Sequence, residues 1–106
     1  HWDVDNEMLH GAFFKDRLGE SIWPRMFKRA HELDPEAKLF VNEFNILSVD
    51  QDFEQVQTDE YIASIRRLLD QGAPIHGIGI QGHVWREAIV AGPGVLKERL
   101  DKVAAL

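Results

Sequence analysis

The feature that most constrains this chain is the regular alternation of two hydrophobic patterns along it. Three short runs rich in β-favouring residues, Trp2–Asn6, 38–45 and 75–83, are each followed by a longer amphipathic run. Short apolar runs of this kind predict strands, and apolar residues at i, i+3 and i+4 spacing predict helices. The sequence therefore predicts the order βαβαβα.

The amphipathic runs predict three helices. The first extends over about 20–33, the second runs from Thr58 or Asp59 to a stop at Gly72, and the third covers about 94–106. Gly72 suits a helix end because glycine readily adopts the left-handed conformation of a C-terminal cap. Each helix is long enough to cross from one strand to the next.

Strands joined by helices pair in parallel through right-handed crossovers, and helices then cover the sheet. The pattern therefore predicts the α/β class, satisfied by either a doubly wound sheet or a (β/α)8 barrel. In both architectures the chemistry gathers at the carboxyl ends of the strands. At 106 residues the chain is one domain at most, or a piece of one.

Composition excludes several partners. Twelve Lys and Arg residues stand against eighteen Asp and Glu residues, giving a net charge of −6, and the basic residues form no block, so we expect no nucleic-acid partner. No apolar run approaches the roughly 18 residues of a membrane span, so we expect no membrane partner. The absence of cysteine excludes disulfides and thiolate sites, but leaves secreted and cytosolic locations open.

Polar clusters follow all three predicted strands: Asn6-Glu7, then 42–45, then 81–83. A carboxyl group at a strand end acts as a general acid when its surroundings disfavour ionisation, which makes Glu7 the leading candidate, against the alternative of an exposed loop glutamate. Asp5 is expected to be structural or solvent-facing. The spacing G-x-G-x-x-G in "GIGIQG" ends a strand without starting a helix, so a dinucleotide site is not expected.

Histidines and an amide complete the candidate site. His83 can donate a hydrogen bond to an anionic group, although a buried structural histidine is the alternative. Gln81, two residues earlier, can hydrogen-bond the same anion or a ligand hydroxyl. "EMLH" has the Glu-x-x-His spacing of di-iron bundles, but no second copy occurs, so we expect no metal and assign His10 to orienting a loop or a carboxylate.

Three ordered motifs carry a family resemblance. "WDVDNE" (2–7), "NEFN" (42–45) and "GIGIQGH" (77–83) resemble the W-D-V-V-N-E, N-D-Y-N and G-I-G-x-Q-x-H motifs of family 10 glycoside hydrolases, the endo-1,4-β-xylanase family. Those motifs belong to the fourth, fifth and sixth barrel strands. The resemblance covers residues 1–106 and implies a partial catalytic domain: three consecutive βα units of a (β/α)8 TIM barrel, with parallel strands and outer helices.

The resemblance also implies roles. It makes Glu7 the general acid/base of a retaining glycosidase and Asn6 a ligand of the sugar hydroxyl beside the scissile bond. Residues 42–45, including Asn42 and Asn45, would border the cleft, while Gln81 and His83 would support the nucleophile. It further implies β-1,4-xylan or xylooligosaccharide as substrate, no cofactor, and a secreted protein.

The nucleophile is the missing part. The family carries it as a glutamate on the seventh strand, which would follow Leu106, so we expect residues 1–106 alone to be inactive. The alternatives are a non-catalytic carbohydrate-binding barrel and a fragment that self-associates through its open face and edges. Two departures stand out: Asp5 replaces an apolar residue, and Glu43-Phe44 replaces Asp-Tyr. Asp5 either disfavours ionisation of Glu7 or points away from it.

Overall fold

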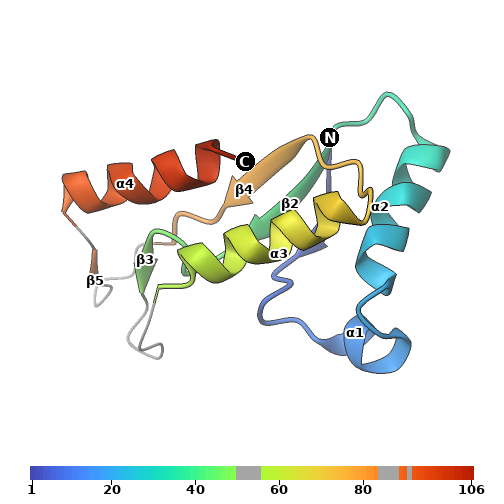
Figure 1. The fold of residues 1–106 in the computed structure, drawn as a ribbon, viewed down its shortest axis with the longest axis horizontal. Coiled ribbons are helices and arrows are strands. Elements are labelled where there is room, and N and C mark those ends of the chain that lie inside the picture. The colour runs from blue at the N-terminus through green and yellow to red at the C-terminus, as the bar shows by residue number, and fades with distance from the viewer. Residues whose placement is uncertain (50–55, 84–88, 91) are drawn as a thin grey trace.

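The computed structural model describes residues 1–49, 56–83, 89–90 and 92–106. The elements in chain order are β1 (Trp2–Asn6), α1 (Phe13–Leu18), α2 (Ile22–Leu33), β2 (Leu39–Glu43), β3 (Ser48–Val49), α3 (Thr58–Asp70), β4 (Gly77–Ile80), β5 (Ile89–Val90) and α4 (Pro93–Ala104). The longer elements follow the predicted βαβαβα order, which confirms the α/β prediction (Figure 1). None of the described helices is long and apolar enough to cross a membrane.

β1, β2 and β4 form one parallel sheet with β2 in the middle. Asn6 pairs with Asn42, and Asn42 pairs with Gly79, so the polar ends of the three strands lie level with one another. The register of β1 shifts between Asp3 and Asp5. The sheet thereby brings three segments that are distant in sequence to one carboxyl edge.

The two faces of β2 differ in burial. Leu39, Val41 and Glu43 are buried, whereas Phe40 and Asn42 on the opposite face are only half-buried. In Figure 1, α3 lies across the sheet and α2 stands beside it. α4 adds Val103 to the core, which comprises Met8, Phe27, Leu39, Val41, Ile46, Tyr61, Ile62, Ile65, Leu68, Ala73 and Val103. Each large apolar side chain fully buried there contributes about 1.5–3 kcal/mol.

The glycines of β4 make room for two side chains of β2. A Cβ at Gly77 would lie 2.1 Å from the Phe40 ring, and one at Gly79 would lie 2.5 Å from Asn42 Oδ1. The isoleucines between and after these glycines pack against the core on the other side of the strand. The alternation of glycine and isoleucine therefore lets Asn42 lie flat against β4, at the face that the helices leave open.

Several details differ from the sequence prediction. α1 is not predicted, because its six residues bury no side chain and so carry no amphipathic period. β3 and β5 are two residues each and pair antiparallel across a long sequence separation, Ser48 with Val90, which no local pattern signals. β2 ends at Glu43 instead of residue 45, since Asn45 turns the chain with a φ of 57°.

Candidate active site

Glu7 occupies the sharp turn that ends β1. Its φ of 63° lies in the left-handed region, which non-glycine residues adopt uncommonly. Glu7 N donates to Asn42 O (2.8 Å), while His10 N and Gly11 N donate to Glu7 O (3.0 and 2.6 Å). A Cβ at Gly11 would lie 3.1 Å from Glu7 O, so the turn favours glycine there. This turn fixes the Glu7 backbone at the carboxyl edge of the sheet.

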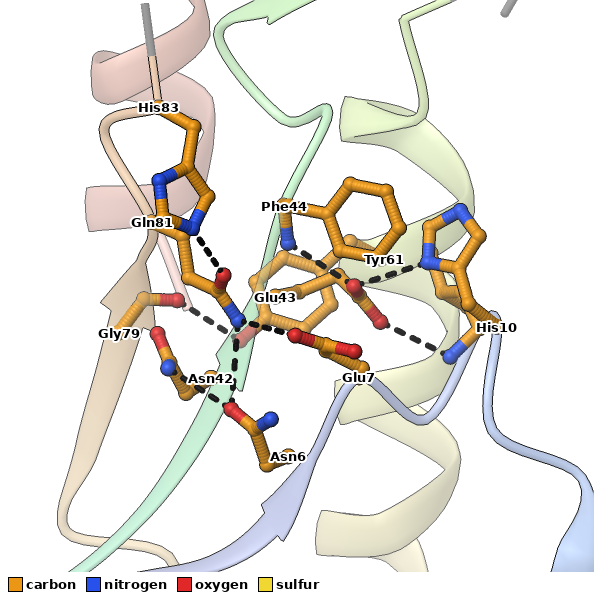
Figure 2. A network of polar contacts seen from close by, with 11 residues as sticks. Asn6, Glu7, His10, Asn42, Glu43, Phe44, Tyr61, Gly79, Gln81 and His83 are labelled. Atoms are coloured by element: carbon orange, nitrogen blue, oxygen red, sulfur yellow. Dashed lines mark hydrogen bonds and ion pairs between the residues drawn. The ribbon is translucent and has the colours of Figure 1, made fainter. Parts of the chain in front are cut away.

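An amide network joins the Glu7 carboxylate to the other two strand ends (Figure 2). Gln81 Nε2 donates to Glu7 Oε1 at 3.0 Å and to Asn6 Oδ1 at 3.3 Å. Asn42 Nδ2 donates to the same Asn6 oxygen at 2.9 Å. His83 Nε2 lies 2.8 Å from Gln81 Oε1. The structure thus brings together five of the predicted site residues: Asn6, Glu7, Asn42, Gln81 and His83.

The network assigns donor and acceptor atoms. Because the Gln81 amide group donates to both Glu7 and Asn6, its Oε1 atom faces His83 and accepts. His83 therefore carries a proton on Nε2. Gln81, for which the family resemblance implied support of the nucleophile, contacts Glu7 itself, and His83 contacts the other end of the same glutamine amide.

Asn45 is not part of this network. Its side chain is 7% exposed, and its backbone carbonyl accepts a hydrogen bond from Gln57 N (3.0 Å). Among the described residues, no hydrogen bond reaches its Nδ2 atom. Its predicted role in binding substrate stays a prediction, and its observed role is to turn the chain after β2.

Asp5 points to the helix side of the sheet. It is 8% exposed, whereas its neighbour Asn6 is exposed, as expected for alternate positions of a strand. Burial, and then the nearby Glu43 carboxylate, raise the pKa of Asp5 from 3.8 to about 6. Asp5 is therefore structural and not solvent-facing, and of the two alternatives for its effect on Glu7, the one in which it points away is correct.

Glu43 also faces the helix side, although the family resemblance implied a place for it on the border of the cleft. It is fully buried, and its carboxylate accepts hydrogen bonds from Leu9 N and Phe44 N, both at 2.9 Å. His10 Nδ1 lies 2.9 Å from Glu43 Oε1, which confirms that His10 orients a neighbouring carboxylate. Strand alternation could have indicated this orientation, because Glu43 follows the buried Leu39 and Val41 at alternate positions.

The described residues contain no group of three or more histidine, cysteine or carboxylate side chains placed to hold a metal ion. What they do provide is a half-buried carboxylic acid, Glu7, surrounded by amides that exchange hydrogen bonds. A carboxyl group can give and take a proton, and amides can bind hydroxyl groups. The arrangement suits acid–base chemistry on a hydroxyl-rich ligand.

Parallel βα units with a carboxylate at the carboxyl edge of the sheet define an α/β protein of the kind that places its site at strand ends. The whole chain, residues 1–106, matches the model of glycosyl hydrolase family 10. The chain belongs to that family.

Similar proteins match the chain over its whole length. Endo-1,4-beta-xylanase 1 of Arabidopsis thaliana is 50% identical over 106 residues, which are 100% of this chain and 11% of that protein. Anti-sigma-I factor RsgI6 of Acetivibrio thermocellus is 46% identical over 106 residues, again 100% of this chain and 13% of that protein. The chain therefore spans only a small part of these relatives.

A solved structure extends the comparison to the fold. The chain superposes on the intracellular xylanase TsXylA of Thermoanaerobacterium saccharolyticum with a TM-score of 0.80 and 31% identity, covering 98% of this chain and 32% of that one. The match, together with the parallel sheet, confirms the prediction of three consecutive βα units of a (β/α)8 barrel.

Proposed function

We propose that the protein carrying this chain is a retaining endo-1,4-β-xylanase and that Glu7 is its general acid/base. The observation that carries the proposal is the Glu7 carboxylate, held by Gln81 at the carboxyl edge of a family 10 sheet. Residues 1–106 then form part of a catalytic domain. The substrate is β-1,4-linked xylan or its oligosaccharides, and two xylanase structures similar to this chain are complexes with xylotriose and xylotetraose.

The hydrogen bond from Gln81 indicates which oxygen of the Glu7 carboxyl group carries the proton. Gln81 Nε2 donates to Glu7 Oε1, so a proton on the carboxyl group belongs on Oε2, which no described residue engages. In the first step Glu7 donates that proton to the glycosidic oxygen as the sugar leaves. In the second step the ionised Glu7 takes a proton from water as that water attacks the glycosyl intermediate.

Asn6 is suited to hold the sugar beside the scissile bond. Its Oδ1 atom accepts from both Asn42 and Gln81, so its Nδ2 group is left to donate. Asn6 is also exposed at the open end of β1. A hydroxyl of the sugar next to the scissile bond can accept from this amide, which orients the substrate relative to Glu7.

A second carboxylate is required about 5–5.5 Å from the first in a retaining mechanism. Among the described residues, Glu43 is fully buried on the helix side of the sheet and cannot face substrate from there. Glu87, the other candidate in sequence, lies outside the described residues. We infer that the nucleophile comes from a part of the protein beyond this chain, and that residues 1–106 alone do not turn over xylan.

A non-catalytic role is the second candidate. It is favoured by the 46% identity to a protein named anti-sigma-I factor RsgI6, which shows that family 10 sequence also occurs in a protein not named as a hydrolase. In that case the same amides would bind xylan without cleaving it.

The test is proton NMR of the anomeric signals while the full protein acts on xylohexaose. We expect new reducing ends to appear first in the β configuration and then to mutarotate, as a retaining enzyme requires. The Glu7→Gln variant should release no new reducing ends. Products that appear first in the α configuration contradict the retaining mechanism, and binding of xylohexaose without any cleavage supports the non-catalytic candidate.

A further inference from the structure

We propose that Glu43 is a positioning residue for Glu7, with its buried carboxylate holding the turn that carries the acid/base. The inference rests on the proposed function of Glu7, but its structural part can be tested without activity. Glu43 does not face the substrate side of the sheet, because it is fully buried on the helix side.

The Glu43 carboxylate collects three hydrogen bonds from two segments of the chain (Figure 2). Leu9 N donates to Oε2, while Phe44 N donates to Oε1 and His10 Nδ1 lies on the same oxygen, all at 2.9 Å. The His10 ring also stacks on the Phe44 ring, with centroids 3.9 Å apart. Glu43 thereby ties the turn after β1 to the end of β2.

The tied residues are those that shape the Glu7 backbone. Leu9 and His10 follow Glu7 by two and three positions, and His10 N donates to Glu7 O at 3.0 Å. Glu7 holds an uncommon left-handed φ of 63°, which costs free energy and persists only when its surroundings fix it. The hydrogen bonds from Leu9 and His10 to Glu43 supply that constraint.

The backbone of Glu43 positions Glu7 from the other side. Gln81 N donates to Glu43 O at 2.8 Å, and the side chain of the same glutamine donates to Glu7 Oε1 at 3.0 Å. One residue of β2 therefore fixes both the turn from which Glu7 projects and the amide that contacts its carboxylate.

The chemistry of a buried carboxylate argues against a purely packing role. An unpaired buried charge is costly, so an apolar residue would serve a core position better unless the carboxylate is needed for its hydrogen bonds. Glu43 accepts at both oxygens, which an amide cannot do. In a Glu43→Gln variant, an NH2 group must face either Leu9 N–H or the Phe44 N–H and His10 pair.

The experiment compares Glu43→Gln with a matched control in the full protein. Thr58→Val is the control, because Thr58 is also buried and its hydroxyl donates to Ile46 O at 2.6 Å, but not to the Glu7 turn. kcat/KM is measured on xylan, whose leaving group needs protonation, and on an aryl xylobioside with an activated leaving group. A misplaced acid should cost about 10–100-fold on xylan and less than about threefold on the aryl substrate.

A second variant covers the case in which Glu43→Gln does not fold. His10→Phe keeps a ring against Phe44 but removes one donor to Glu43, so it should change the ratio of the two substrates in the same direction by a smaller factor. Thr58→Val should leave that ratio unchanged. Equal losses on both substrates in both site variants, or no loss at all, overturn the proposal.

Hydrogen exchange separates this proposal from the proposed function. The amides of residues 9–11 should exchange roughly fivefold faster in Glu43→Gln than in the wild type and in Thr58→Val, since a net hydrogen bond is worth about 1 kcal/mol. If the wild type cleaves no xylan, the proposed function fails while faster exchange still supports the positioning role. If the amides of residues 9–11 exchange at the wild-type rate in Glu43→Gln, the positioning role is overturned, whatever the activity on xylan.

Discussion

Replacing Asp5 by asparagine should stabilise the protein at neutral pH, although it removes a charge close to the site. Asp5 is 8% exposed, and burial followed by the Glu43 carboxylate raises its pKa from 3.8 to about 6. Its Oδ2 atom has no hydrogen-bond partner among the described residues. Asparagine has the same shape and leaves the same position unsatisfied, so the main change is the loss of the buried charge.

The sign follows from proton binding in the two states. Between pH 3.8 and about 6 the folded protein binds more protons at Asp5 than the unfolded chain, so Asp5 lowers stability as the pH rises through this window. Below that window the carboxyl group is protonated in both states and the penalty is absent. Above it the penalty is complete, at most about 3 kcal/mol at about 1.4 kcal/mol per pH unit.

The assay is urea unfolding of the full wild-type and Asp5→Asn proteins at several pH values from 3.5 to 7.5. We expect the two free energies of unfolding to agree at the acid end and the variant to gain as the pH rises, approaching the limit of about 3 kcal/mol. Asp3→Asn, an exposed neighbour on the same strand, is the control and should show no such trend. A variant that is less stable at pH 7, or a difference that does not vary with pH, would refute the reasoning.

Three further predictions concern activity and association. Residues 1–106 alone should show no turnover on xylan or on an aryl xylobioside, and turnover that is lost in a Glu7→Gln control would contradict this. The same fragment should self-associate in sedimentation experiments, since it leaves Trp2 and Phe13 about 60% exposed and the edges of β1 and β4 open; a cooperatively melting monomer would contradict this. In the full protein, Gln81→Leu should lower kcat/KM on xylan about 10–100-fold, because it removes the hydrogen bond to the Glu7 carboxylate, and an unchanged value would separate Gln81 from the site.

The sequence could predict the main elements because each has a repeat of apolar residues that is typical of a strand or of a helix. The isoleucine–glycine alternation of β4 and the amphipathic runs of α2 and α3 are local signals, and polar residues after each strand indicated where the strand ends meet. The pairing of β3 with β5 could not be predicted, because two-residue strands far apart in the chain carry no period.

At the site, the sequence predicted which residues come together more readily than it predicted where their side chains point. Asn6, Glu7, Asn42 and Gln81 come together as the strand ends require. Which way a side chain points depends on the backbone conformation, and no local pattern signalled the left-handed φ of 57° at Asn45 or the burial of that residue.

The buried carboxylates illustrate the same limit in the core. Asp5 and Glu43 occupy helix-facing positions where an apolar residue is expected. Strand alternation could have placed Glu43 there, but two of the three donors to its carboxylate come from Leu9 and His10, which lie more than thirty residues away in sequence. Long-range hydrogen bonds of this kind leave no local pattern.

The most direct test of the central claim, that Glu7 is the general acid/base, is kcat/KM of the Glu7→Ala variant of the full protein on two substrates. This constant reports the steps up to glycosyl transfer, in which a poor leaving group needs a proton and an activated one does not. We predict a loss of about 10²–10⁴ on xylan and near wild-type kcat/KM on an aryl xylobioside with a strongly acidic phenol. Equal losses on the two substrates would contradict the acid role of Glu7.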